Sequence, residues 1–176
     1  ALVATAVVFF VILGTQTEIT SAFYGKVAID PLGTCFKLLF LAITALAIFT
    51  SGISKEIPER QFGEYYTLLL AVAFGMFLMA GANDLLIAYL GIEMVSIVSF
   101  AMVGFRQKDR KSSEAALKYV VFGGAASGIM LFGISLLFGL FGETDFTAIH
   151  YALNDWGIKY FQDSLATGNA GFPLTL

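Results

Sequence analysis

Four long apolar runs constrain the fold of this 176-residue chain more than any other feature. They cover residues 32–51, 64–82, 85–105 and 113–141. A helix rises about 1.5 Å per residue, so each run can cross a bilayer hydrocarbon core of roughly 30 Å. In that core only helices and closed barrels satisfy the hydrogen-bonding groups of the backbone. We therefore predict an all-α fold, a polytopic bundle of transmembrane helices.

The composition supports a membrane protein and excludes several other classes. Apolar residues make up 58% of the chain and charged residues 13%, whereas soluble domains are nearer half apolar and about a quarter charged. The net charge of −3 is spread along the chain and indicates no nucleic-acid partner. Cys35 is the single cysteine, which excludes an internal disulfide and a cysteine-cluster metal site.

Three further segments flank the four runs. Residues 1–14 are apolar but too short to span a bilayer, which is typical of the closing half of a truncated helix. Residues 142–171 are largely polar, and residues 172–176 have the character of the start of a further helix. We therefore expect the chain to be a single membrane-domain fragment of a longer protein.

The polar segment 142–171 contains an apolar stripe with helical spacing. Its members lie three or four positions apart: Phe146, Ile149, Leu153 and Trp156. This spacing predicts an interfacial helix that lies on the membrane surface, on the extracytoplasmic side. His150 beside the stripe has no second ligand-type residue at metal spacing. We interpret His150 as an interfacial side chain and predict no metal site.

Local signals mark two helix starts and one packing surface. Asp30, which precedes a proline, and Asp84 are each placed to cap the first turn of the helix that follows. Lys37 is interpreted as a long side chain that reaches the interface from near a helix end. The run of small residues at 123–128 favours close packing against a neighbouring helix.

The basic residues predict the orientation in the membrane. Four of the ten Lys and Arg residues lie within 106–111, and Lys55 and Arg60 lie within 52–63. These two loops are two spans apart and therefore on the same side. Because cytoplasmic loops carry an excess of Lys and Arg, we predict that both face the cytoplasm or its organellar equivalent.

Glu93 lies inside the third apolar run, with no charged residue three or four positions away. An ionised carboxylate at bilayer depth costs from about 2.5 to more than 10 kcal/mol, so it marks a candidate functional site. Lys118 lies near the start of the next run, offset from Glu93 in depth by roughly 10 Å. It also forms a favourable i,i+4 pair with Glu114. A local pair and a site role for Lys118 both remain open, as does a protonated structural carboxyl at Glu93.

Four segments of the sequence closely resemble one known family: IDPLG (29–33), GEYYTLLL (63–70), LGIE (90–93) and SSEAALKY (112–119). The family is the N-type antiporter-like subunit of respiratory complex I, chain N of the bacterial NADH:quinone oxidoreductase. The likeness covers nearly the whole chain. The L- and M-type subunits and the Mrp antiporters carry a more aromatic, proline-containing context around the same glutamate, so the resemblance favours the N type.

The resemblance implies fourteen transmembrane helices, of which this chain would hold the end of the second through the sixth and the start of the seventh. It implies proton translocation driven by distant redox chemistry, with Glu93 as the fifth-helix glutamate and Lys118 as the sixth-helix lysine. Nothing in the sequence suggests a nucleotide, flavin, haem or iron–sulfur site, so we expect the iron–sulfur clusters, flavin and quinone in partner subunits. The expected surroundings are other membrane subunits and the lipid of a bacterial inner membrane, or its organellar equivalent.

On this interpretation Glu93 and Lys118 form a proton relay. A carboxyl in a low-dielectric site favours its neutral form, and a nearby ammonium favours the charged form. A change at Lys118 would therefore load or release a proton at Glu93. Two alternatives remain open: an Mrp-type cation/proton antiporter subunit without a redox partner, and a non-transporting membrane scaffold. The electron donor, NADH or a ferredoxin, is decided in other chains.

Overall fold

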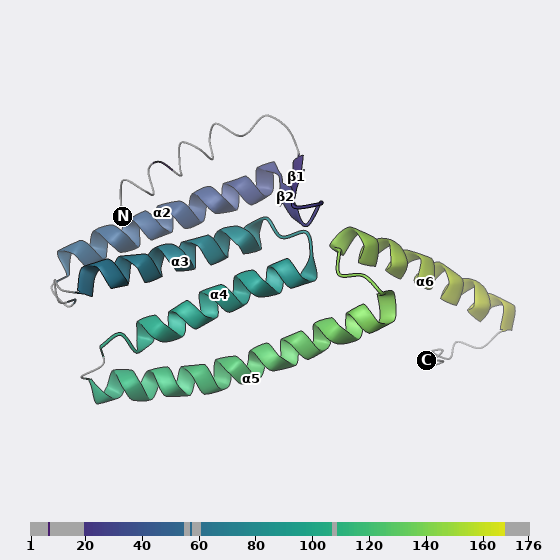
Figure 1. Ribbon diagram of the computed structural model, residues 1–176. Coiled ribbons are helices and arrows are strands. Elements are labelled where there is room, and N and C mark those ends of the chain that lie inside the picture. The colour runs from purple at the N-terminus through teal and green to yellow at the C-terminus, as the bar shows by residue number, and fades with distance from the viewer. Residues whose placement is uncertain (1–6, 8–19, 55–56, 58–60, 107–108, 168–176) are drawn as a thin grey trace.

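The computed structural model describes residues 7, 20–54, 57, 61–106 and 109–167, and most of these residues are helical (Figure 1). The elements follow in chain order: β1 (Thr20–Ala22), β2 (Val27–Ile29), α2 (Pro31–Ile53), α3 (Phe62–Ala80), α4 (Leu85–Val103), α5 (Arg110–Phe141) and α6 (Phe146–Thr167). Helices α2 to α5 are each long and apolar enough to cross a membrane. The all-α, polytopic fold predicted from the sequence is confirmed.

The helix bounds differ from the expected spans by a few residues at some ends. The predicted ends at 82 and 105 lie two residues beyond the last residues of α3 and α4. The reason is that Gly81 and Gly104 follow those last residues as C-caps. Helix α5 begins three residues before the expected position 113. The expected partial helix at 1–14, apart from residue 7, and the expected helix start at 172–176 lie outside the described residues.

Aspartate side chains begin three of the helices. Asp30 accepts a hydrogen bond of 3.0 Å from the Gly33 backbone N–H and is followed by Pro31 in the first turn of α2. Asp84 accepts one of 2.8 Å from the Leu86 N–H at the start of α4. Each bond satisfies a backbone donor that has no partner within its own helix. Both predicted caps are confirmed, and Asp109 caps α5 in the same way.

Consecutive helices pack against one another in an up-and-down arrangement, with α3 against α4 as the most extensive contact (Figure 1). Two glycines allow this approach. A Cβ atom on Gly91 would lie 3.0 Å from the Gly75 carbonyl oxygen and 3.0 Å from the Met79 nitrogen. The α3 and α4 backbones therefore touch where a larger residue would force them apart.

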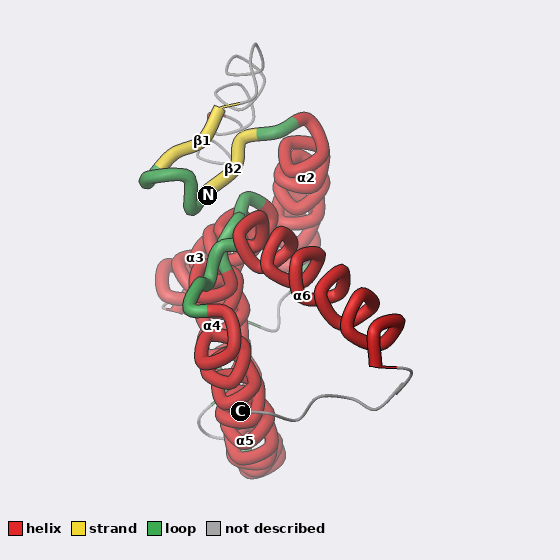
Figure 2. Tube along the Cα trace, turned by 90° about the vertical axis from the view of Figure 1, so that its right-hand side faces the viewer, coloured by secondary structure: helices red, strands yellow, loops and turns green. Residues whose placement is uncertain are grey.

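The two ends of the bundle differ: the two basic loops lie at one, called here the loop end, and the β-hairpin lies at the other, called the hairpin end. At the loop end, α2 and α4 finish and α3 and α5 begin, so the two basic loops lie on the same side, as predicted (Figure 1). At the hairpin end, strands β1 and β2 pair antiparallel, with Thr20 opposite Ile29 (Figure 2). The turn between them holds Phe23, Tyr24 and Gly25 at positive φ. The hairpin was not predicted, because two of these three residues give no turn signal in the sequence.

Most large apolar side chains of the spanning helices point outward. Only a few apolar residues are buried: Leu41, Ile48, Ala73, Ile134 and Ile149. Phe122 on α5, by contrast, is 75% exposed. Lipid or further helices can cover such a surface without the cost it would carry in water. The exposed faces of α2 to α5 therefore match a membrane environment.

Helix α6 turns away from the bundle beyond the hairpin end (Figures 1 and 2). Of its predicted apolar stripe, Ile149 is buried, while Phe146, Leu153 and Trp156 are each between 40% and 47% exposed. The helix itself lies within the expected segment 142–171. The stripe thus leaves apolar surface uncovered, as an interfacial helix requires.

Candidate functional site

Glu93 lies on the face of α4 that contacts α5. On that face the Tyr89 hydroxyl lies 3.0 Å from the Ser127 hydroxyl. The Phe100 ring packs edge-on against Tyr119, with ring centroids 4.7 Å apart. Successive helical residues are about 100° apart, so Glu93 projects within roughly 40° of both Tyr89 and Phe100. Glu93 is therefore directed toward α5, between a polar contact and an aromatic one.

The Oε1 atom of Glu93 is buried and has no hydrogen-bond partner among the described residues. It is the only buried side-chain oxygen or nitrogen in that part of the chain with this property. Leaving such an atom unpaired costs roughly 1–3 kcal/mol, and more if it is charged. Ser96, a possible donor one turn away, does not bond this oxygen. No donor among the described residues therefore holds this oxygen of the Glu93 carboxyl in place.

Lys118 forms a local ion pair on α5. Its Nζ lies 2.6 Å from Glu114 Oε1, and the two side chains are 66% and 58% exposed, respectively. Lys118 projects about 140° to 180° away from Gly123 and Ser127, which face α4. The sequence left a local pair and a site role open, and the structure forms the local pair.

The structure does not bring Glu93 and Lys118 together. The contacts of Tyr89 with Ser127 and of Phe100 with Tyr119 place Glu93 near the level of residue 125 on α5. Lys118 lies about seven residues from that level, or about 10 Å at the helical rise. This offset agrees with the roughly 10 Å expected from the sequence. Any influence of Lys118 on Glu93 within this part of the chain therefore acts through space.

The small-residue run at 123–128 packs against α4 along one side only. A Cβ atom on Gly123 would collide with the end of the Phe100 ring, so a larger residue here would force that ring to move. Ser127 faces α4 as well, through its hydrogen bond. Gly124 and Gly128 would place a Cβ atom in open space. The predicted packing role is confirmed for Gly123, and no described residue covers the other two glycines.

Asp84 does more than cap its helix. Its Oδ2 accepts hydrogen bonds of 2.6 Å from Lys26 Nζ and 2.6 Å from the Thr144 hydroxyl, while Oδ1 accepts from the Leu86 N–H. Asp84 is 2% exposed. Reading the sequence found the cap, because it is local. It missed Lys26 and Thr144, which lie 58 and 60 positions away.

The pKa values of this cluster shift in the directions that hold it charged. Burial alone would raise the pKa of Asp84, but the hydrogen bonds from Lys26, Thr144 and the Leu86 backbone outweigh burial and lower it. The hydrogen bond to Asp84, with the nearby charges of Asp84, Asp145 and Glu143, raises the pKa of Lys26. Asp84 and Lys26 therefore form a stable ion pair at neutral pH.

Three backbone hydrogen bonds lie next to the Lys26–Asp84–Thr144 cluster at the hairpin end. We call the cluster together with these three bonds the hairpin latch. The bonds join three connections: Ala28 N–H to Gly81 O (2.7 Å), Asn83 N–H to Lys26 O (2.9 Å) and Leu85 N–H to Thr144 O (2.8 Å). The β-hairpin, the α3–α4 turn and the α5–α6 turn are thereby tied together.

Comparison with known proteins places this arrangement in a family. The family described as NADH:quinone oxidoreductase/Mrp antiporter, TM, matches residues 82–172, a stretch that contains Glu93, Lys118 and half of the hairpin latch. The chain belongs to this family. The family resemblance predicted from the sequence is confirmed.

Two bacterial relatives show which members of the NADH:quinone oxidoreductase/Mrp antiporter family the chain resembles. The chain is 48% identical over 122 residues to NADH-quinone oxidoreductase subunit N of Anaeromyxobacter sp. (strain Fw109-5), covering 69% of this chain and 24% of that protein. It is 44% identical over 145 residues to subunit N 2 of Chloroherpeton thalassium, covering 81% of this chain and 28% of that protein. The chain thus spans about a quarter of the length of these relatives.

A solved member of a respiratory assembly has the same fold. The structure described as respiratory complex I from Thermus thermophilus with bound Aureothin contains a chain that matches with a TM-score of 0.67 and 29% identity. The match covers 82% of this chain and 31% of that one. The chain described here is therefore an integral membrane protein of antiporter-like architecture.

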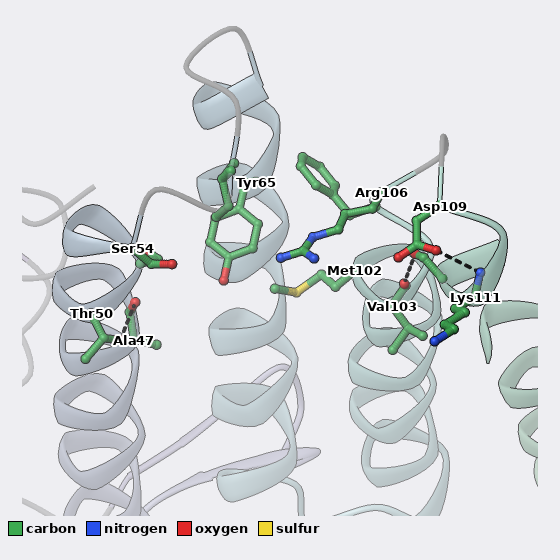
Figure 3. Close-up of a pocket in the computed structure, with 13 residues that line it drawn as sticks. Ala47, Thr50, Ser54, Tyr65, Met102, Val103, Arg106, Asp109 and Lys111 are labelled. Carbon is green, nitrogen blue, oxygen red and sulfur yellow. Dashed lines mark hydrogen bonds between the residues drawn. The ribbon is translucent and has the colours of Figure 1, made fainter. Parts of the chain in front are cut away.

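This family member also has a cavity of about 630 Å³ at the loop end, lined by α2, α3, α4 and α5 (Figure 3). Its polar lining includes Thr50, Ser54, Tyr65, Arg106 and Lys111. Neither Glu93 nor Lys118 lines it. Met102, on the cavity wall, is nine residues from Glu93, or about 14 Å along α4. The cavity is therefore separate from the Glu93 site.

The structure also shows what surrounds Lys37 and His150, the remaining residues singled out in the sequence. A Cβ atom on Gly81 would lie 3.2 Å from Lys37 Nζ, so Lys37 extends toward the hairpin end, as expected for a side chain that reaches the interface. His150 lies 3.2 Å from the Asn154 amide on α6. Over the described ranges, no group of three or more His, Cys, Asp or Glu side chains could hold a metal ion.

Proposed function

We propose that the complete protein is a proton-translocating membrane subunit of a complex I-type NADH:quinone oxidoreductase, and that Glu93 carries a proton during translocation. The observation that carries this proposal is the buried, unpartnered Oε1 of Glu93 inside a spanning helix. Intramembrane carboxylates are rare and typically mark ion or proton pathways. Family membership supplies the setting in which such a pathway is expected.

The proposed role of Glu93 depends on a choice between two protonation states. No described residue donates a hydrogen bond to the buried Oε1 of Glu93, so no fixed partner within this part of the chain selects one state. A positive charge that approaches the site, or water that enters it, favours ionisation. Glu93 can therefore take up a proton in one state of the protein and release it in another.

Lys118 is proposed to bias Glu93 through space and not by contact. Two unit charges about 10 Å apart interact by roughly 1.7 kcal/mol at an effective dielectric constant of about 20. This is an upper limit, because Lys118 also projects away from α4 and is partly neutralised by Glu114. The limit corresponds to about an eighteenfold change in a protonation equilibrium. Lys118 would thus tune the relay without being its main carrier.

The redox chemistry is proposed to belong to partner subunits. The complete protein would work beside other membrane subunits, with iron–sulfur clusters, flavin and quinone bound elsewhere in the assembly. The named relatives are bacterial subunit N proteins, which supports a bacterial inner membrane as the location. In this proposal the chain contributes proton transfer and no redox centre of its own.

A second candidate is an Mrp-type cation/proton antiporter subunit, because the family description covers both activities. The identities to proteins named NADH-quinone oxidoreductase subunit N favour the first candidate. The native assembly should therefore copurify with NADH:quinone reductase activity and with iron–sulfur signals. An assembly that exchanges cations for protons and lacks both properties would establish the antiporter instead.

The decisive test measures proton uptake by vesicles that contain the purified complex, at matched complex content. Glu93→Gln keeps the size and polarity of the side chain and removes the titratable group. We expect this variant to assemble and to lose proton uptake. A Glu93→Gln complex that pumps like the unmodified complex would show that Glu93 is not the carrier.

A further inference from the structure

The contact between α4 and α5 changes character at Glu93. We call it the α4–α5 seam, formed by Tyr89 and Phe100 on α4 and by Tyr119, Gly123 and Ser127 on α5. On the hairpin side of Glu93 the seam holds two hydroxyl groups in hydrogen-bond contact. On the loop side it holds the Phe100 ring, wedged against Gly123. A hydroxyl pair that joins the two helices therefore lies on the hairpin side.

Helix geometry brings the Glu93 carboxyl toward this hydroxyl pair. Residues four positions apart on a helix have Cβ atoms about 5–6 Å apart, and Tyr89 is four positions before Glu93. Helical side chains lean toward the N-terminus, over the preceding turn. The Glu93 side chain therefore leans toward Tyr89 and away from Phe100. Its buried Oε1 has no hydrogen-bond partner among the described residues.

The Tyr89–Ser127 pair has the chemical properties of a relay. Each hydroxyl can donate one hydrogen bond and accept others. Either atom of the pair can be the donor at their separation of 3.0 Å. An oxygen that accepts an incoming proton and releases its own ends neutral, so the pair can pass a proton without being consumed. The pair also connects two helices, so it responds to any movement between α4 and α5.

We infer that the Tyr89–Ser127 pair passes protons between Glu93 and the hairpin end of the bundle. This inference rests on the function proposed above. Glu93 in its acid form gives its proton to the Tyr89 oxygen, directly or through one water. Tyr89 releases its own hydroxyl proton to Ser127, which releases one in turn toward the hairpin side. The reverse sequence reprotonates Glu93. On the loop side the Phe100 ring, which has no exchangeable proton, packs against Gly123.

Conservative substitutions separate this role from packing. Tyr89→Phe removes the hydroxyl and keeps the ring, and Ser127→Ala removes the other hydroxyl. Tyr119→Phe is the matched control for the first, because it makes the same change on the same seam next to Phe100. Ser135→Ala is the control for the second, since Ser135 bonds the Phe132 carbonyl of its own helix. Ser127→Thr restores a hydroxyl.

The variants are made in the complete subunit within the whole complex, and proton uptake per quinone reduced is measured in vesicles. We expect a several-fold loss in Tyr89→Phe and in Ser127→Ala, a similar loss in the double variant, and recovery in Ser127→Thr. The two controls should pump normally. The infrared carbonyl band of protonated Glu93, identified by its loss in Glu93→Gln, should shift in Tyr89→Phe and stay in place in Tyr119→Phe.

The outcomes distinguish this inference from the function on which it rests. If Glu93→Gln abolishes pumping while Tyr89→Phe and Ser127→Ala pump normally with an unshifted carbonyl band, the relay is wrong and the function stands. A loss of pumping equal in Tyr89→Phe and Tyr119→Phe also overturns it, because the effect would then be one of packing. If Glu93→Gln itself pumps normally, the proposed function fails first.

Discussion

Helix α4 carries two acidic side chains with opposite surroundings. Asp84 at its start accepts hydrogen bonds from Lys26, Thr144 and the Leu86 backbone and is almost fully buried. Glu93, nine residues later, has a buried Oε1 with no partner among the described residues. A carboxylate with every acceptor satisfied keeps its charge and stabilises the structure. One with an unsatisfied oxygen has no such support, so the comparison is consistent with a structural role for Asp84 and with the proton transfer proposed for Glu93.

The strongest test of this contrast is the effect of Glu93→Gln on transport. We expect proton uptake to fall to the level of an uncoupled control, because α4 carries no second carboxyl side chain that could replace Glu93 on this face. Subunit stability should be unchanged or slightly higher, since an intramembrane charge costs at least about 2.5 kcal/mol. Vesicle proton uptake and the thermal stability of the complex measure the two effects. Loss of assembly without a transport defect in the assembled fraction would reverse the assignment.

Asp84→Asn should give the opposite pattern. Asparagine can still cap α4, but it cannot form an ion pair with Lys26. We expect destabilisation of about 1–3 kcal/mol, the cost of leaving buried polar groups poorly paired. The measurement is the unfolding or dissociation temperature of the complex, with pumping normalised to the assembled fraction. Normal stability combined with lost pumping would move Asp84 into the proton path.

The pH dependence of the hairpin latch gives a smaller effect with a defined sign. The pKa of Asp84 is below its ordinary value of 3.8, so its contribution is present above about pH 4 and lost as pH falls through the lowered value. The pKa of Lys26 is above its ordinary value of 10.5, so its contribution is present below that value and lost as pH rises further.

We therefore expect hydrogen-exchange protection of the Ala28 and Leu85 amides, corrected for intrinsic rates, to stay constant between about pH 5 and pH 9. Both amides belong to the latch. Asp84→Asn should lower their protection across this whole range. A step in protection near neutral pH in the unmodified protein would contradict the latch as described.

The smallest expected effect belongs to Lys118. Its distance from Glu93 limits the electrostatic influence to about 1.7 kcal/mol, so Lys118→Ala should reduce pumping by less than about twentyfold. Lys118→Arg keeps the charge and should retain most activity. Lys159→Ala is the control, because Lys159 forms the same kind of exposed i,i+4 pair on α6, with Asp155. A loss in Lys118→Ala as complete as in Glu93→Gln would show that Lys118 carries the proton itself.

Reading the sequence alone determined the features that depend on nearby residues. The four spans follow from length and apolar composition, and the caps at Asp30 and Asp84 follow from side-chain chemistry within one turn. The Glu114–Lys118 pair was foreseen because helical spacing brings positions four apart into contact. Glu93 was identified as a candidate from its apolar surroundings. In each case the physical cause acts over a few residues of chain.

Only the tertiary structure decided which distant groups meet. Lys26 lies 58 residues from Asp84, and Tyr89 lies 38 residues from Ser127. Such contacts depend on how the α3 and α4 backbones approach and on how far α5 is rotated, which no local pattern records. The unpartnered oxygen of Glu93 is likewise a property of what α5 places opposite it. The sequence therefore identified the acid, and packing between helices left its buried Oε1 without a partner among the described residues.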